Sequence, residues 1–312
     1  MRLLIAIAAV LSGGPQGSIS QEGRVPRDGF VGGVVDEAGQ IYVLRRDSLQ
    51  LFNSRDVVPV SIPLDVKSTL ADPAFRNVGF HAIALNPKNQ PAVLWSGVRQ
   101  SGAEETYVTF IGLGFSVRLG RPAIIATDLA FGPMDDIFVC GLMRQVPVSL
   151  VHHFARDGSY RTSFHPHISA NPEDVQAIAK TGRSRVIVIG NAVYVASPFV
   201  SNTVFEYSSS GELVRQHDFG APATGPNRRK FVTIFARGGE ALAESVAENQ
   251  GSFVNEIHRL RDGQLLLSIP ARDLAGPVFG ILPDGRVVYR NARSRITEGD
   301  AVHIQRDSVH IR

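Results

Sequence analysis

Residues 30–64, FVGGVVDEAGQIYVLRRDSLQLFNSRDVVPVSIPL, contain four short apolar runs separated by polar turns. The first run, FVGGVV, is short enough for a strand that is covered on both faces. The second run, IYVL, is rich in β-branched and aromatic residues, which suit a pleated surface, and LQLF follows after another turn. The fourth run contains two prolines, which donate no ladder hydrogen bond and confine it to a sheet edge. This order predicts one blade of a β-propeller, with the first strand innermost.

The same order of apolar run, polar turn and second apolar run recurs along the chain. Subtracting the successive starts of the expected inner strands gives separations of 49, 46, 59, 47 and 46 residues. Such near-constant spacing is typical of stacked blades, so the pattern predicts an all-β propeller of six blades, each with four antiparallel strands. The expected inner strands begin near Phe30, Gly79, Ile125, Ser184, Phe231 and Pro277.

Two segments depart from the simple pattern. Residues 171–182 fall in the one long interval and are predicted to form a short inter-blade helix, with Asn171 as its cap and Pro172 at its first position. Residues 240–248, EALAESVAE, have a helix former's composition, but their place between two apolar strands predicts a strand. Outer hairpins are predicted at the glycine-containing turns 156–159, 209–212 and 261–264.

Several of these segments resemble the repeats of six-bladed propellers of the NHL and TolB-like superfamily. The resemblance is carried by DEAGQIYVL at 36–44, SLQLFNS at 48–54 and NAVYVASPFVSNTVFEYSSSGELVRQ at 191–216. It implies a six-bladed fold and no particular activity, because functions on this platform range from ligand and protein binding to ester or lactone hydrolysis. The spaced acidic and asparagine ligands of the calcium-dependent lactonase relatives cannot be placed on the expected inner strands of this chain.

Size, charge and cysteine content narrow the class of protein. With 312 residues and 44% hydrophobic content, the chain is expected to form a single propeller domain over residues 21–312. The formal net charge of +3 is too small to indicate nucleic-acid binding. The single cysteine, Cys140, cannot form an intramolecular disulfide, and its apolar run predicts an inert core residue.

The N-terminus has the pattern of a secretory signal peptide. Met1 and Arg2 give a charged start, residues 3–11 are nine apolar residues, and residues 12–20 are small and polar. We expect cleavage after Ser20 and a secreted or periplasmic protein. Nine apolar residues are too few to span a bilayer, so no membrane span is expected. The alternative is that residues 3–11 form a first strand of the propeller.

His81 and Asp128 are the candidate ligand-binding residues. Each lies in an expected inner strand, in GFHAIAL and IIATDLAF, close to where such strands line the central channel. We predict that both contribute to a site at the channel mouth. The alternative for Asp128 is a structural pair, because an isolated buried carboxylate is very costly.

Other candidate sites are weaker. His152 and His153 are adjacent on an expected strand, so they point to opposite faces, and His165 and His167 lack acids or cysteines nearby. We expect these to be surface histidines and expect no metal site. No nucleophile elbow, P-loop, HExxH or dinucleotide-binding motif occurs, so no catalytic residue and no cofactor is predicted.

These observations favour an exported, non-catalytic binding or interaction module, a monomer whose partner is a protein or a small-molecule ligand. The alternative is an ester or lactone hydrolase with a metal or water site in the central channel. That alternative predicts at least three Asp, Glu, Asn or His side chains at one channel mouth.

Overall fold

The computed structural model describes residues 30–52, 60–64, 75–120, 124–143, 151–164, 184–197, 201–219, 229–249, 252–270, 277–290 and 309–311. All regular structure in these segments is β, in antiparallel sheets built from strands that are consecutive in sequence. The predicted signal peptide at residues 1–20 and the predicted helix at 171–182 lie outside the described residues. No helix in the described segments is long and apolar enough to cross a membrane.

Five sheets have four strands each, and we number them blades 1 to 5 in chain order. Blade 1 contains β1 (Phe30–Val35), β2 (Ile41–Arg45), β3 (Ser48–Phe52) and β4 (Val60–Pro63). Blade 2 contains β5 (Phe75–Leu85), β6 (Pro91–Arg99), β7 (Glu104–Phe110) and β8 (Phe115–Arg118). Blade 3 contains β9 (Ile124–Phe131), β10 (Ile137–Met143), β11 (Val151–Phe154) and β12 (Tyr160–Phe164).

The remaining sheets follow the same order. Blade 4 contains β13 (Arg185–Ile189), β14 (Ala192–Ala196), β15 (Thr203–Ser208) and β16 (Leu213–Asp218). Blade 5 contains β17 (Arg229–Arg237), β18 (Glu240–Asn249), β19 (Ser252–Arg259) and β20 (Leu265–Pro270). The C-terminal sheet contains only β21 (Val278–Ile281), β22 (Val287–Arg290) and β23 (Val309–Ile311).

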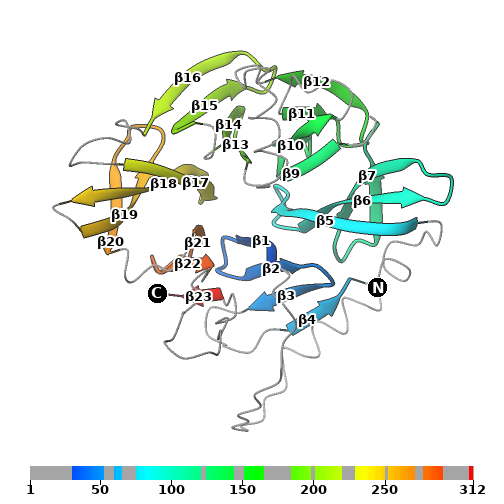
Figure 1. Ribbon diagram of the computed structural model, residues 1–312, viewed down its shortest axis with the longest axis horizontal. Helices are drawn as coiled ribbons and strands as arrows, with labels where there is room; N and C mark the ends of the chain where they lie inside the picture. Colours follow the sequence, from blue (N-terminus) through cyan, green and yellow to red (C-terminus); the bar gives the residue numbers. More distant parts are fainter. Residues whose placement is uncertain are drawn as a thin grey trace, which may run out of the picture.

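The sheets form a ring around a central axis, as Figure 1 shows. Each innermost strand contacts the innermost strand of the next sheet, and β21 returns to contact β1. The propeller class and the four-stranded antiparallel blade are thus confirmed, but the expected six such blades are wrong. There are five, and a three-stranded sheet completes the ring. The prediction was based on the number of inner strands, of which there are six. In the described residues the last sheet has one strand, β23, beyond β22, where each complete blade has two.

The hydrophobic core lies between neighbouring sheets, in six clusters. In β10, Ile137 and Val139 pack toward blade 2, whereas Phe138 and Cys140 pack toward blade 4. Since successive side chains of a strand point to opposite faces, both faces of this strand are buried. This burial explains why the blade strands read as continuous apolar runs. Cys140 is fully buried as predicted, and burial raises the pKa of its thiol.

The segment EALAESVAE is the strand β18, as its place in the repeat predicted. Ala241 and Ala243 pack against blade 4, and Leu242 packs against the C-terminal sheet. A helix would not send alternate residues to two opposite sheets, so tertiary packing overrides the local helical composition. The predicted outer hairpins also form, between β11 and β12, β15 and β16, and β19 and β20.

Four turns between an inner strand and the next strand share one geometry. Each turn is five residues long, at 36–40, 86–90, 132–136 and 282–286. The N–H of its first residue donates to the carbonyl of its fifth, and the N–H of its fourth residue donates to the carbonyl of its first. The fourth residue has positive φ, which glycine, asparagine and aspartate tolerate best. We call this end of the ring the hairpin face. The fourth residues and their φ angles are Gly39 (83°), Asn89 (57°), Asp135 (62°) and Gly285 (90°).

The seam between the first and last sheets is closed by side-chain packing against glycines. A Cβ placed on Gly33 would lie 2.7 Å from the ring of Phe279, and one on Gly280 would lie 2.2 Å from Cγ2 of Val35. Each glycine therefore makes room for a large side chain of the opposite sheet. Within the described residues, no strand from one end of the chain joins the sheet of the other end.

Candidate functional site

The innermost strands of all six sheets line a cavity of about 170 Å³ along the axis. Each of these strands is the edge strand of its sheet, so the wall combines side chains with one unpaired backbone edge. The lining side chains are apolar or glycine, with three exceptions: Asp128, Arg185 and Thr233. A cavity of this size is smaller than the roughly 300–1,000 Å³ of sites for drug-sized ligands, so it suits a small molecule.

A second cavity of about 350 Å³ lies at the hairpin face, and we call it the mouth. It shares Val35, Leu85 and Ala236 with the lining of the axial cavity, so the two cavities adjoin. Its polar lining comes from turns of blades 1, 2 and 5. The polar side chains of the mouth are Asp36, Glu37, Asn86, Asn89 and Arg237.

Two of the mouth's polar side chains serve the turns themselves. Oδ1 of Asp36 accepts the Gln40 N–H at 2.7 Å, and Oδ1 of Asn86 accepts the N–H groups of Lys88 and Gln90 at 3.0 and 2.9 Å. These are the local caps that Asp and Asn favour in turns. Glu37 and Asn89 are exposed, so they are the groups that a ligand at the mouth would meet first.

Asp128 lies on the wall of the axial cavity and bridges blades 3 and 4. Its Oδ1 is 3.2 Å from Nη1 of Arg185, and its Oδ2 accepts the Val186 N–H at 2.9 Å. Burial raises the pKa of Asp128, while the Arg185 charge and the Val186 amide oppose that shift. The expected structural pairing of this carboxylate is present. Its role in ligand binding stays a prediction.

His81 occupies a different environment and does not line the axial cavity. It is the extra residue of a β-bulge between Phe80 and Ala82. Its Nε2 lies 2.7 Å from Oγ of Ser96, and burial lowers its pKa to about 4, so the ring is neutral at neutral pH. No hydrogen bond or ion pair in the described residues joins His81 to Asp128. The structure therefore does not bring the two predicted residues together as one site.

The β-bulge at His81 recurs around the ring. Five of the six inner strands carry one. In β1, β5, β9 and β17 the bulged residue lies four or five positions before the last residue of the strand, whereas in β21 it lies two positions before it. Bulges of this kind re-aim a side chain or terminate pairing. His81 is the only ionisable residue among the five bulged residues. The bulged residues are Val31, His81, Thr127, Val232 and Phe279.

Sequence reasoning missed Arg185, the cation that faces the axial cavity. A signal for it existed: Arg185 starts an otherwise apolar expected inner strand, RVIVI, just as Asp128 interrupts IIATDLAF. The pairing itself was not visible, because the two residues lie 57 positions apart in the chain. The predicted order of blades already made these two inner strands neighbours in the ring, but it gave no register between them.

Glu244 is a second buried carboxyl that bridges two sheets. It is 1% exposed, and its Oε2 accepts the N–H of Val278, the first residue of β21, at 2.9 Å. Burial raises its pKa to about 8, and the Val278 amide only partly opposes this shift. At neutral pH the carboxyl is therefore mostly protonated. Like Asp128, it accepts a backbone N–H of the next sheet, but no ion pair to it is found among the described residues.

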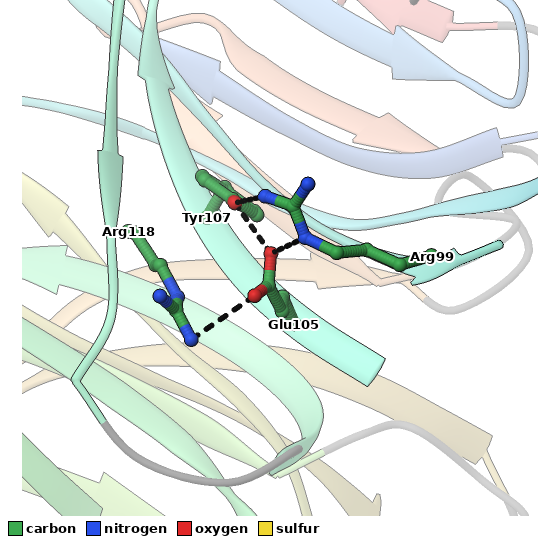
Figure 2. Close-up of polar contacts among 4 residues, drawn as sticks. All are labelled: Arg99, Glu105, Tyr107 and Arg118. Atoms are coloured by element: carbon green, nitrogen blue, oxygen red, sulfur yellow. Dashed lines mark hydrogen bonds and ion pairs between the residues drawn. The ribbon is translucent and has the colours of Figure 1, made fainter. Parts of the chain in front are cut away.

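Blade 2 carries a polar cluster of Arg99, Glu105, Tyr107 and Arg118, which Figure 2 shows. None of the four lines the axial cavity or the mouth. Oε2 of Glu105 accepts hydrogen bonds from Nε of Arg99 and from the Tyr107 hydroxyl, both at 2.6 Å, and Oε1 lies 3.0 Å from Nη2 of Arg118. The Arg99 guanidinium also lies over the Phe75 ring, 4.9 Å from its centroid. Glu105 is 8% exposed and fully paired, so the cluster ties β6, β7 and β8 together.

The prediction that His152 and His153 lie on the surface is wrong. Both are buried, because β11 is the third strand of blade 3 and is covered on both faces. Nε2 of His152 donates to the Gly141 carbonyl at 2.9 Å, so its Nδ1 accepts from Ser163 at 2.8 Å. His153 stacks on Phe138 and lies 3.4 Å from Asp136. His165 and His167 lie outside the described residues.

Metal-ligating side chains do not converge in the described part of the chain. No three His, Cys, Asp or Glu residues there are grouped so that they could hold a metal ion. The mouth does carry four side chains of the types that the hydrolase alternative requires. Because Asp36 and Asn86 cap turns, only Glu37 and Asn89 remain as ready oxygen ligands.

No family model and no curated protein matches the sequence. Among solved structures, TolB from Acinetobacter baumannii is similar with a TM-score of 0.50 and 13% identity, over 81% of this chain and 57% of that chain. A functionally unknown protein from Desulfotomaculum acetoxidans DSM 771 gives a TM-score of 0.49 and 13% identity, over 90% and 88% of the two chains. Hydrazine synthase from Kuenenia stuttgartiensis gives a TM-score of 0.46 and 10% identity, over 88% of this chain and 80% of that chain.

At these identities the likeness shows the fold alone. The match to TolB agrees with the ring of sheets described above and with the TolB-like resemblance of the repeats. It carries no activity, ligand or partner to this chain.

Proposed function

We propose that this chain is an exported, non-catalytic binding module that takes a small ligand into its central channel through the mouth at the hairpin face. One observation carries this proposal: an apolar axial cavity of about 170 Å³ adjoins a polar mouth of about 350 Å³. Small-molecule sites have this character, with a mostly apolar wall and a few polar groups that fix orientation.

The groups around the channel support binding better than catalysis. Asp128 already accepts two hydrogen bonds, from Arg185 and from the Val186 amide. The pair of His81 and Ser96 does not line the axial cavity, and no hydrogen bond to Nδ1 of His81 is found in the described residues. A nucleophile and its base are normally oriented by a third group. The hydrolase alternative therefore has less support than ligand binding.

A plugged channel tests the proposal. Ala236 is exposed and lies where the axial cavity meets the mouth, so Ala236→Trp fills the junction with little expected effect on stability. The probes are hexanoate, hexylamine and hexanol, which share one short alkyl chain, and ligand-observed NMR measures their binding. We expect wild type to bind at least one of them, one molecule per chain, and Ala236→Trp to lose that binding.

Ala236→Ser is the matched control, because it changes the same residue without filling the junction. It is expected to bind as wild type does. Binding of no probe by wild type, or equal binding by the tryptophan variant, would contradict the proposal. His81→Ala belongs in the same assay: weaker binding would bring His81 into the site, and unchanged binding would leave it as a partner of Ser96.

Export is proposed from residues 1–20 alone. The protein recovered from a periplasmic or culture-fluid fraction is expected to begin at Gln21, and N-terminal sequencing checks this. Recovery only from the cytoplasm with Met1 intact would contradict export. Light scattering of the same material measures the mass in solution, for which we propose a monomer.

A further inference from the structure

The axial cavity contains one cation and one anion among its described lining residues, and they are paired with each other. Arg185 and Asp128 approach to 3.2 Å across the gap between blades 4 and 3. The two partners differ in exposure: 31% of the Arg185 side chain is exposed, against 9% for Asp128. A molecule in the channel therefore meets more of the guanidinium than of the carboxylate.

Arg185 has N–H donors that do not face Asp128, whereas each oxygen of Asp128 already accepts a hydrogen bond. A guanidinium carries five N–H groups, and one nitrogen of Arg185 faces Asp128. Both oxygens of Asp128 are engaged, one by Arg185 and one by the Val186 amide. The pair thus presents unused N–H donors at the wall of an apolar cavity. There, hydrogen bonds to an anion are stronger than in water.

Arg185 is the first residue of β13, which ends at Ile189 on the hairpin face. Four residues of strand correspond to about 13 Å, so Arg185 lies at the end of the cavity away from the hairpin face. Between it and the mouth the wall is apolar, from Ile187 and Val188 to Leu85 and Ala236. A ligand that reaches Arg185 from the mouth therefore places an apolar body along this wall.

We infer that the channel ligand is a small monocarboxylate with an apolar body, its carboxylate against the Arg185 guanidinium and its body directed toward the mouth. This inference rests on the proposed function. Arginine and carboxylate match as planar groups that can share two parallel hydrogen bonds. A phosphate monoester fits less well, because it carries ≈ −1.5 to −2 charges and Arg185 already shares its own charge with Asp128.

The test compares hexanoate, hexylamine and hexanol by NMR titration against wild type and two variants. Asp128→Asn keeps an acceptor for the Val186 amide and releases Arg185 from its anion. The double variant Arg185→Gln with Asp128→Asn removes both charges, so no buried carboxylate is left unpaired. Arg215→Gln, on the exposed outer strand of blade 4, is a control with the same loss of charge as the arginine substitution.

We expect wild type to bind hexanoate about ten-fold more tightly than hexylamine or hexanol, as one charge-assisted contact allows. Asp128→Asn is expected to bind hexanoate at least as tightly as wild type. The double variant is expected to lose about ten-fold in hexanoate affinity, with hexanol binding unchanged. Arg215→Gln is expected to match wild type, and thermal unfolding of each variant reports whether it is folded.

Two results would overturn the carboxylate inference and leave channel binding standing. One is tighter binding of hexylamine that is lost in Asp128→Asn, which would make the aspartate the head-group partner. The other is equal binding of hexanoate and hexanol, unchanged in the double variant. Binding of none of the three probes would instead remove the proposed function, and this inference with it.

Discussion

Gly158→Ala is expected to lower the free energy of unfolding by about 3–4 kcal/mol, because a buried backbone contact must be pushed apart. Gly158 has a φ of +83°, and a Cβ built there would lie 2.1 Å from the carbonyl oxygen of Arg118. That oxygen belongs to the outer strand of blade 2 and has no flexible side chain that could yield. On the same surface the Gly120 N–H donates to the Gly158 carbonyl at 2.9 Å.

Gly263→Ala is the matched control. It also follows an aspartate in a turn between the third and fourth strands of a blade, one residue longer than the Gly158 turn, with a φ of +70° and no atom within 4 Å of a built Cβ. In both turns the aspartate accepts the N–H of the residue after the glycine. Backbone strain alone costs on the order of 1 kcal/mol. Urea unfolding measures the free energy of unfolding of both variants. Similar decreases for the two substitutions would show that the contact of Gly158 with the Arg118 carbonyl is not tight.

The second large effect is a pH-dependent gain in stability from Glu244→Gln. Burial raises the Glu244 pKa from 4.5 to about 8 in the folded state, so as pH rises the unfolded chain loses this proton first. The wild-type stability linked to this group is therefore fully present below about pH 4.5 and falls until about pH 8. Glutamine has no proton to lose and keeps an acceptor for the Val278 amide.

At about pH 8 the glutamine variant is expected to be more stable than wild type by about 3–5 kcal/mol, and near pH 5 the two are expected to agree within about 1 kcal/mol. Urea unfolding at both pH values measures the difference in the free energy of unfolding between the variant and wild type. Groups that titrate in the same way in both proteins do not contribute to this difference. Glu240→Gln, exposed at the start of the same strand, is the control. A pH-independent difference for Glu244→Gln would show that this carboxyl is not held protonated.

The strand pattern could be predicted because a propeller buries both faces of its blades. FVGGVV matches β1 residue for residue, and the other inner strands begin within a few residues of their predicted starts. EALAESVAE became a strand because its place in the repeat outweighed its helical composition. The number of complete blades was missed, since a regular spacing of inner strands contains no information about the outer strands of the last repeat.

The site was harder to predict, because its chemistry comes from pairs across neighbouring sheets. Asp128 was chosen because it lies in an expected inner strand near the channel, and the alternative, a structural pair, was expected because a buried carboxylate needs a partner; Arg185 is that partner. His81 was chosen by its position in an expected inner strand, but a β-bulge and Ser96 give it a local role that strand position alone does not reveal. The buried histidines of β11 were missed because their partners lie in adjacent strands.

The packing of Phe279 against Gly33 and of Val35 against Gly280 has a consequence for how the molecule assembles. Each sheet can form from a continuous stretch of chain, so most contacts are made between near neighbours in sequence. Only the union of first and last sheets joins residues separated by nearly the whole chain. We expect it to be the slowest step of folding and the first boundary to part under tension.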